Sequence, residues 1–137
     1  DYAYAEAIQS DGKIVVGGYA HIAADGHNEF AVARYNSDGS LDTTFSSDGL
    51  VTLFDAGGSS EDTAFAMAIE EDGTIVVGGQ ENGDLALGFF NSDGTVDTAH
   101  DADGIVTQDL GGTEKINALI AQSDGTIVAG GVKATIL

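Results

Sequence analysis

Short apolar stretches alternate along the chain with turns rich in Asp, Gly and Asn. The first two stretches, Ala5–Gln9 and Lys13–Ala20, are joined through an Asp-Gly pair at 11–12, which is a strong signal for a β-hairpin. A third stretch begins at Phe30, and after an Asx-rich turn Leu50–Phe54 forms a fourth. No segment has the 3.6-residue periodicity of an amphipathic helix. The pattern therefore predicts an all-β fold with very little helix.

The same pattern recurs, so the chain is a repeat array. Ala5–Gly18 returns as Ala66–Gly79 and as Ala118–Gly131, and Phe30–Thr43 returns as Leu85–Thr98. Length varies in two places only, at 19–29 and at 53–62, which we interpret as surface loops. The repeats divide the array into unit 1 at 5–65, unit 2 at 66–117 and a partial unit 3 at 118–137.

Side-chain size indicates which strands are covered. The second strand carries an unbroken apolar run, Ile14–Val16 in unit 1 and Ile75–Val77 in unit 2, as expected of a strand covered on both faces. The third strand alternates, so that one face fills space and the other lets a neighbouring sheet approach closely. Its large residues are Phe30, Val32, Leu85 and Leu87, and its small residues are Ala31, Ala33, Ala86 and Gly88. We expect the Gly-Gly pairs at 17–18, 78–79 and 130–131 to lie where units meet.

The size of the repeat indicates the architecture. Four antiparallel strands in about 52 residues are typical of one β-propeller blade. A propeller uses about four to eight blades, or at least roughly 200 residues, whereas this chain has 137 and holds about 2.5 units. We therefore expect an incomplete ring, with the chain, which starts at Asp1, a fragment of a longer protein. The alternative is an open solenoid-like stack or a fibre subunit.

Composition adds a large charge asymmetry. The chain has 4 Lys and Arg against 23 Asp and Glu, a formal charge of −19, and no Cys. The charge excludes nucleic-acid binding and attraction to anionic membranes, and no apolar run approaches the ~18 residues that membrane insertion needs. The lack of Cys excludes disulfides and thiolate metal sites.

Two Asx-rich loops are candidate calcium sites. Each has oxygen-bearing side chains at relative positions 1, 3 and 7 and glycine at position 4, and Ca²⁺ takes about six to eight oxygen ligands from such loops. The alternative is that these side chains bond only their own turns. We predict that no cofactor is required. The candidate ligands are Asn36, Asp38, Asp42, Asn91, Asp93 and Asp97.

Candidate catalytic and zinc-binding groups are sparse. Glu70 and Glu71 form a carboxylate pair, but glycosidases need one carboxyl with a pKa raised by burial, and we expect both to be solvated beside their turn. His21 and His27 flank Asp25 and would suit zinc; the alternative is an acidic loop with incidental histidines. We predict no catalytic residues and no enzymatic activity.

Two blocks, Gln9–Gly18 and Phe30–Phe45, resemble the bacterial delta-60 repeat. The resemblance implies a propeller-like, secreted or surface-attached bacterial repeat protein without known catalytic residues. Unit 2 departs from the pattern, because Phe89 replaces Arg34 and His100 replaces Phe45. We expect Arg34 to be a buried donor that ties neighbouring turns and Phe45 to plug its loop against the sheet end, so that unit 2 is held differently there.

The sequence thus predicts a non-enzymatic extracellular scaffold acting in adhesion, surface structure or ligand presentation. We expect its partners to be other blades or copies, and a protein or glycan ligand at loops 19–29 and 53–62. One alternative is a fibre subunit assembled through open strand edges. The other is part of a glycan-active enzyme whose site lies in further blades.

Overall fold

The computed structural model describes residues 1–24, 26–53 and 62–134, which contain ten β-strands and no helix. No helix in this part of the chain is therefore long and apolar enough to cross a membrane. The strands are β1 (Tyr2–Ile8), β2 (Ile14–Ile22), β3 (His27–Tyr35), β4 (Leu50–Leu53), β5 (Thr63–Ile69), β6 (Ile75–Glu81), β7 (Asp84–Phe90), β8 (Ile105–Gln108), β9 (Thr113–Ala121) and β10 (Ile127–Ala134).

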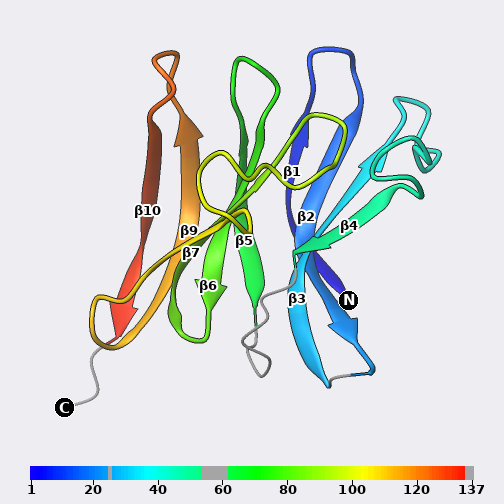
Figure 1. Cartoon of the computed structure of the whole chain (residues 1–137). Helices are drawn as coiled ribbons and strands as arrows, with labels where there is room; N and C mark the ends of the chain where they lie inside the picture. The colour runs from blue at the N-terminus through cyan, green and yellow to red at the C-terminus, as the bar shows by residue number, and fades with distance from the viewer. Residues whose placement is uncertain (25, 54–61, 135–137) are drawn as a thin grey trace.

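The strands form three antiparallel sheets in the orders β1-β2-β3-β4, β5-β6-β7-β8 and β10-β9. The sheets stand side by side like blades of a fan, and the first strands β1, β5 and β9 are neighbours (Figure 1). This arrangement confirms the all-β prediction and the four-stranded propeller-like units, and the ring is incomplete. The second and third sheets begin at Thr63 and Thr113, slightly before the unit boundaries at 66 and 118 that the repeats give.

The Asp-Gly hairpins follow from local backbone chemistry. In the first of them the amide of Gly12 donates to the carbonyl of Gln9 over 2.9 Å, and Gly12 has a φ of 86°. The turn is therefore a three-residue loop that ends in a left-handed glycine, a common hairpin geometry. The same bond recurs at Gly73 and Gly125. All three hairpins lie at one end of the fan (Figure 1).

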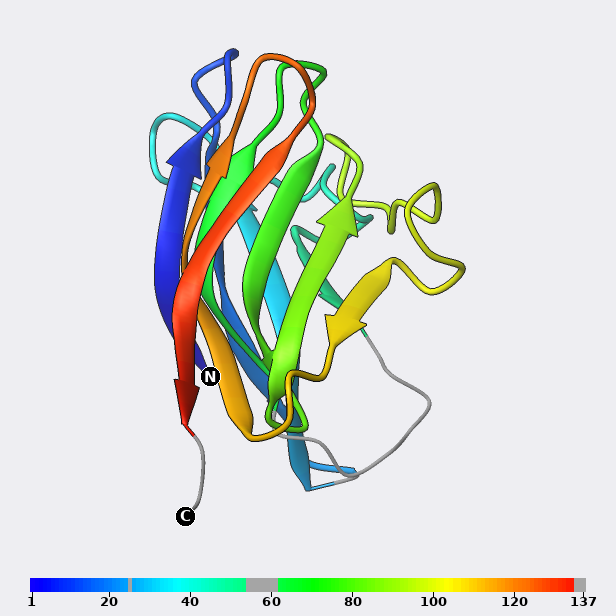
Figure 2. The same ribbon diagram turned by 90° about the vertical axis from the view of Figure 1, so that its left-hand side faces the viewer.

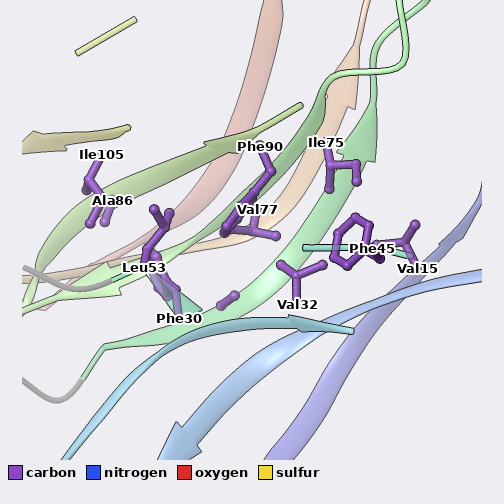
Figure 3. Close-up of a cluster of buried hydrophobic side chains, with 11 residues drawn as sticks. Val15, Phe30, Val32, Phe45, Leu53, Ile75, Val77, Ala86, Phe90 and Ile105 are labelled. Atoms are coloured by element: carbon purple, nitrogen blue, oxygen red, sulfur yellow. The ribbon is translucent and has the colours of Figure 1, made fainter. Parts of the chain in front are cut away.

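The first two sheets pack through a large face against a small face. A Cβ placed on Gly88 would lie 2.6 Å from Leu53 Cδ1 and 3.4 Å from Phe30 Cδ2, so the space above this glycine is filled by the first sheet. Ala86 beside it is fully buried, whereas Leu87 on the opposite face is half-buried. The predicted size alternation of the third strand is confirmed. Figure 3 shows the resulting core between the two sheets.

Coverage of the second strands differs from unit to unit. Ile75, Val76 and Val77 of β6 are fully buried, as predicted for a strand covered on both faces. Val16 of β2 is only half-buried, and Val128 of β10 is 45% exposed. The prediction holds for the central sheet alone, because each outer sheet has one face that no other described strand covers (Figure 2).

The Gly-Gly pairs serve two purposes, of which the sequence indicates only one. The first glycine faces the next sheet, since a Cβ on Gly17 would lie 2.7 Å from Met67 Cε. The second glycine instead faces a β-bulge in its own sheet: a Cβ on Gly79 would lie 1.8 Å from the carbonyl oxygen of Thr63. The bulge brings the first strand so close that only glycine fits.

The expected loop at 19–29 is mostly strand. Tyr19 pairs with Phe30 and Ile22 pairs with His27, so that β2 and β3 extend as a hairpin. The extra length that we interpreted as a loop therefore prolongs an existing ladder, because backbone pairing satisfies the peptide groups of both strands. Residues 54–61 of the second expected loop lie outside the described part of the chain.

Candidate functional site

A cleft of about 550 Å³ opens between the first two sheets, at the end with the Asp-Gly hairpins. Lys13 and Arg34 line it from the first sheet, and Glu70, Glu71 and Asp72 line it from the second. It carries charges of both signs on facing walls.

The positive wall is held by one buried carboxylate. Asp42 is 3% exposed, and its Oδ2 accepts hydrogen bonds from Lys13 Nζ at 2.6 Å and from Arg34 Nε at 2.7 Å. Its Oδ1 accepts from the hydroxyl of Thr44 at 2.7 Å. Both carboxylate oxygens are therefore satisfied, as burial of a charge requires.

Arg34 also ties the first sheet to the second. Its Nη1 donates to the carbonyl of Ser92 at 2.5 Å, and its guanidinium lies 4.7 Å from the centre of the Phe45 ring. Phe45 is fully buried, and the amide of Ser46 donates to the carbonyl of Asp93 at 2.9 Å. The predictions that Arg34 ties neighbouring turns and that Phe45 plugs its loop are both confirmed. Sequence reasoning missed Lys13 as the second cation on Asp42.

Unit 2 lacks this arrangement at the equivalent edge. Phe89 is buried and stacks on His100 with ring centres 4.0 Å apart and planes 7° apart. His100 Nδ1 lies 3.6 Å from Asp97 Oδ2. A stacked aromatic pair thus stands where unit 1 has the contact between Arg34 and Phe45, in agreement with the expectation that unit 2 is held differently at this edge.

The candidate calcium ligands mainly bond their own turns. Asp38 Oδ1 accepts from the Ser40 amide and hydroxyl, and Asp93 Oδ1 accepts from the same groups of Thr95. The remaining candidates are also engaged: Asn36 binds Lys13 and Ser40, Asn91 binds Thr95 and Val96, Asp97 binds Ala99, and Asp42 carries its two cations. This geometry favours the turn interpretation, and calcium binding by these loops stays a prediction.

Turn hydrogen bonds lower several carboxyl pKa values. The hydroxyl of Ser40 lowers the pKa of Asp38, and that of Thr95 lowers the pKa of Asp93. The pKa of Asp42 is held far below its ordinary value, chiefly by Lys13 and then by Thr44, with a smaller contribution from Arg34. Each of these hydrogen bonds stabilises the charged form of the acid.

Among the described residues, the acidic wall of the cleft and the histidines show few features of a catalytic or zinc-binding site. Glu70 is half-buried and Glu71 is exposed, so neither lies in an apolar pocket of the kind that tunes a glycosidase acid. His21 Nδ1 lies 3.1 Å from Asn28 Oδ1, while His27 lies on β3 with Nε2 3.6 Å from Glu29 Oε1. Asp25, the expected third zinc ligand, lies outside the described residues.

Residues 9–45 match the family model of a β-propeller domain of unknown function, DUF5122. The matched segment contains Lys13, Arg34, Asp42 and Phe45, and thus the whole positive wall of the cleft. The match agrees with the propeller-like repeat family that the sequence blocks indicate, and the delta-60 name stays a prediction. A comparison of the chain with curated proteins gave no match.

The ion pair at Asp42 predicts that the difference in stability between the wild type and Asp42→Asn depends on pH. Because the pKa of Asp42 is lower in the folded chain than the ordinary ~3.9, its charge stabilises the fold above that value, and this contribution is lost as the pH falls through the folded pKa. We expect Asp42→Asn to unfold at lower urea than the wild type at pH 7, and the gap to shrink below about pH 4. Urea titrations at several pH values measure it. Asp101→Asn, in an exposed turn, controls for the charge change, and a gap that stays constant down to pH 2 contradicts the prediction.

Proposed function

We propose that the chain is a non-enzymatic repeat scaffold, part of an extracellular propeller-like protein at the bacterial surface that acts in adhesion, surface structure or ligand presentation. The observation that carries this proposal is the packing of the sheets. Sheets add to one another by face contact, and the first and last keep exposed apolar side chains, such as Ile8 at 72%, Tyr2 at 64% and Ile120 at 63%. An interface that can be extended in this way is suited to a scaffold.

Two further observations support a role without catalysis. The charged groups of the cleft from the first sheet are engaged in structural bonds, above all Lys13 and Arg34 on Asp42. Arg34 also binds the next sheet through Ser92. A group held in this way stabilises the junction and is poorly placed to bind a substrate.

The surfaces proposed for ligand contact are the β2–β3 hairpin extension and the connection at 53–62. Tyr2, Tyr4 and Tyr19 form a cluster with ring centres 5.5 to 6.3 Å apart, and Tyr2 and Tyr4 are largely exposed. Exposed aromatic rings suit stacking against sugars or partner side chains. The cluster reaches the hairpin through Tyr19, which pairs with Phe30 at its base.

The short hairpin of unit 2 is the template for a variant of unit 1 that tests the proposal. In unit 2 the equivalent hairpin closes through the residues Asn82 and Gly83. Replacing 21–28 by Asn-Gly in the full protein should shorten the hairpin and leave the sheet intact. We expect bacteria that display this variant to adhere less to glycan-coated and protein-coated surfaces than bacteria displaying the wild type.

The controls separate the alternatives. Ser123→Ala, in the exposed β9–β10 turn, should adhere like the wild type. Circular dichroism should show that every variant keeps its β-sheet fold, the shortened hairpin losing only the strand residues that were removed. Antibody labelling should detect the protein on intact cells. Labelling only after lysis, or adhesion that survives deletion of the whole array, contradicts the proposal. Turnover of a glycan would favour the enzyme alternative.

One observation favours the fibre alternative. Among the described residues β10 pairs only with β9, so its outer edge is open, and Val132 on it is 51% exposed. An open edge can pair with a strand of another copy. A fibre would be supported by a particle size that grows with concentration in sedimentation velocity experiments and by filaments in electron micrographs that are lost in Val132→Lys. A monodisperse species at all concentrations would exclude it.

A further inference from the structure

Three carboxylates meet at the junction of the second and third sheets, at the end opposite the cleft. Asp84 begins β7, Asp109 follows β8, and Glu114 is the second residue of β9. One carboxylate oxygen from each lies within 4.8 Å of the others. Figures 1 and 2 show the β6–β7 hairpin and the β8–β9 connection side by side at this end. Three separate segments thus bring negative charge to one point.

Glu114 is the unusual member of the group. It is fully buried, and among the described residues neither of its carboxylate oxygens has a hydrogen-bond partner. Asp109 is exposed, with Oδ1 accepting from the amide of Gly111 at 2.6 Å. A buried carboxylate without a partner is costly in free energy. A positive group placed against the three acids would offset this cost.

The lysines near this junction do not supply that group. Lys133 pairs with Glu114 across the β9–β10 ladder, but its Nζ donates to the carbonyl of Leu110. The ammonium of Lys115 lies 5.0 Å from the centre of the Phe65 ring on another strand. Among the described residues, neither lysine forms an ion pair with these carboxylates.

The junction between the first and second sheets (the first junction) can be compared with the junction between the second and third sheets (the second junction). Sheet register aligns Glu29 with Asp84, and Asp62 with Glu114. The amide of Asp62 donates to the carbonyl of Asn28 at 3.1 Å, as the amide of Glu114 donates to the carbonyl of Gly83 at 2.6 Å. Both first-junction acids are buried too, but there His27 Nε2 lies 3.6 Å from Glu29 Oε1.

The position of His27 is taken in unit 2 by Asn82, which carries no charge. The first junction therefore has an imidazole beside its acids. The second junction has an additional acid, Asp109, and no equivalent cation among the described residues. A cation from solution would balance this difference.

We propose that Asp84, Asp109 and Glu114 bind one Ca²⁺ ion, which joins the second sheet to the third. Carboxylate oxygens are the ligands that Ca²⁺ prefers, at about 2.3–2.6 Å from the ion. Ligands on opposite sides of the ion are then up to about 5 Å apart, which fits three oxygens within 4.8 Å of one another. Mg²⁺ needs shorter distances of about 2.1 Å and a stricter octahedron. Water and backbone carbonyls complete the shell.

The test compares thermal unfolding of the chain in 10 mM CaCl₂ and in EGTA, with NaCl added to equal ionic strength. With an affinity of about 10⁻⁴ M, within the usual range of extracellular calcium modules, we expect Ca²⁺ to raise the Tm by about 5–10 °C. Isothermal titration calorimetry should give one strong site per chain.

Three variants locate the site. Glu114→Gln should abolish the calcium-dependent Tm rise, and in EGTA it should be at least as stable as the wild type, because it removes repulsion between acids. Asp109→Asn changes an exposed residue and keeps the test valid if Glu114→Gln fails to fold. Asp93→Asn, in a turn with a candidate calcium motif, should keep the full rise.

Three results overturn the proposal. The first is no Tm rise and no binding heat with Ca²⁺. The second is a rise that persists in Glu114→Gln and in Asp109→Asn but disappears in Asp93→Asn, which would place the ion in the Asx-rich turn. An equal rise with NaCl alone would also overturn it, because screening of the net charge of −19 would then explain the effect.

Discussion

Replacing Gly79 by alanine is expected to destabilise the chain by about 3 kcal/mol, near the upper end for overpacking, which corresponds to a fall in Tm of about 10 °C. The new Cβ would lie 1.8 Å from the carbonyl oxygen of Thr63 and 3.0 Å from Ala64 Cα. Both neighbours are backbone, so neither can turn aside as a side chain would. The bulge in the β5–β6 ladder would have to open.

Two glycines of the same motif give matched controls. A Cβ on Gly78 would meet Leu119 Cδ1 at 2.8 Å, a flexible side chain that can move, so Gly78→Ala should cost about 1 kcal/mol. A Cβ on Gly130 would have only Ala118 Cβ nearby, at 4.0 Å. Gly130→Ala should be neutral or slightly stabilising. Urea denaturation measures the free energy of unfolding of the three variants. Equal losses in Gly79→Ala and Gly130→Ala would contradict the close approach of the β5 backbone to Gly79.

Arg34→Ala is expected to cost about 3 kcal/mol, the usual loss when one partner of a buried ion pair is removed. The substitution removes one of the two cations on Asp42 and leaves Lys13 as the other. It also removes the bond to Ser92 and the contact with Phe45. Hydrogen exchange should report the same change locally. The amide of Ser46, which donates to Asp93 across the junction, should exchange faster in the variant.

Lys13→Ala is the matched control for this prediction. Lys13 contacts the same oxygen of Asp42, but its side chain is 28% exposed. Exposed ion pairs contribute about 0–1 kcal/mol, so Lys13→Ala should cost about 1 kcal/mol. A double-mutant cycle of Arg34→Ala with Asp42→Asn should give a coupling energy above about 1 kcal/mol. Additive effects of the two substitutions would show that the interaction between Arg34 and Asp42 does not contribute to the stability of the chain.

Local chemistry explains why much of the fold could be predicted. An Asp-Gly pair between apolar runs defines a hairpin within five residues, and the amide bond of Gly12 to Gln9 is of that kind. The size alternation at Phe30 and Val32 likewise reports which face is filled. Both signals lie within one strand or one turn, where sequence and geometry are directly linked.

Features that depend on contacts between distant parts of the chain could not be predicted in the same way. Lys13 reaches Asp42 across 29 positions, and Glu114 reaches Asp84 only because β9 docks beside the β6–β7 hairpin. One signal was present: the aligned position at the start of the first strand of each sheet is acidic, namely Asp1, Asp62 and Glu114. The hairpin at 19–29 was misread because extra length between repeats does not distinguish a loop from a longer ladder.

The unequal faces of the sheets give the array a direction. The filled face of the first sheet, with Phe30 and Leu53, meets the open face above Gly88 of the second, so that two different surfaces form the contact. Such a contact is heterologous, and heterologous contacts repeat head to tail until a rotation closes them into a ring or leaves a filament. A symmetric dimer through these faces would oppose large to large or small to small. Copies of this chain that join through their end faces should therefore do so with their chains pointing the same way around a common axis.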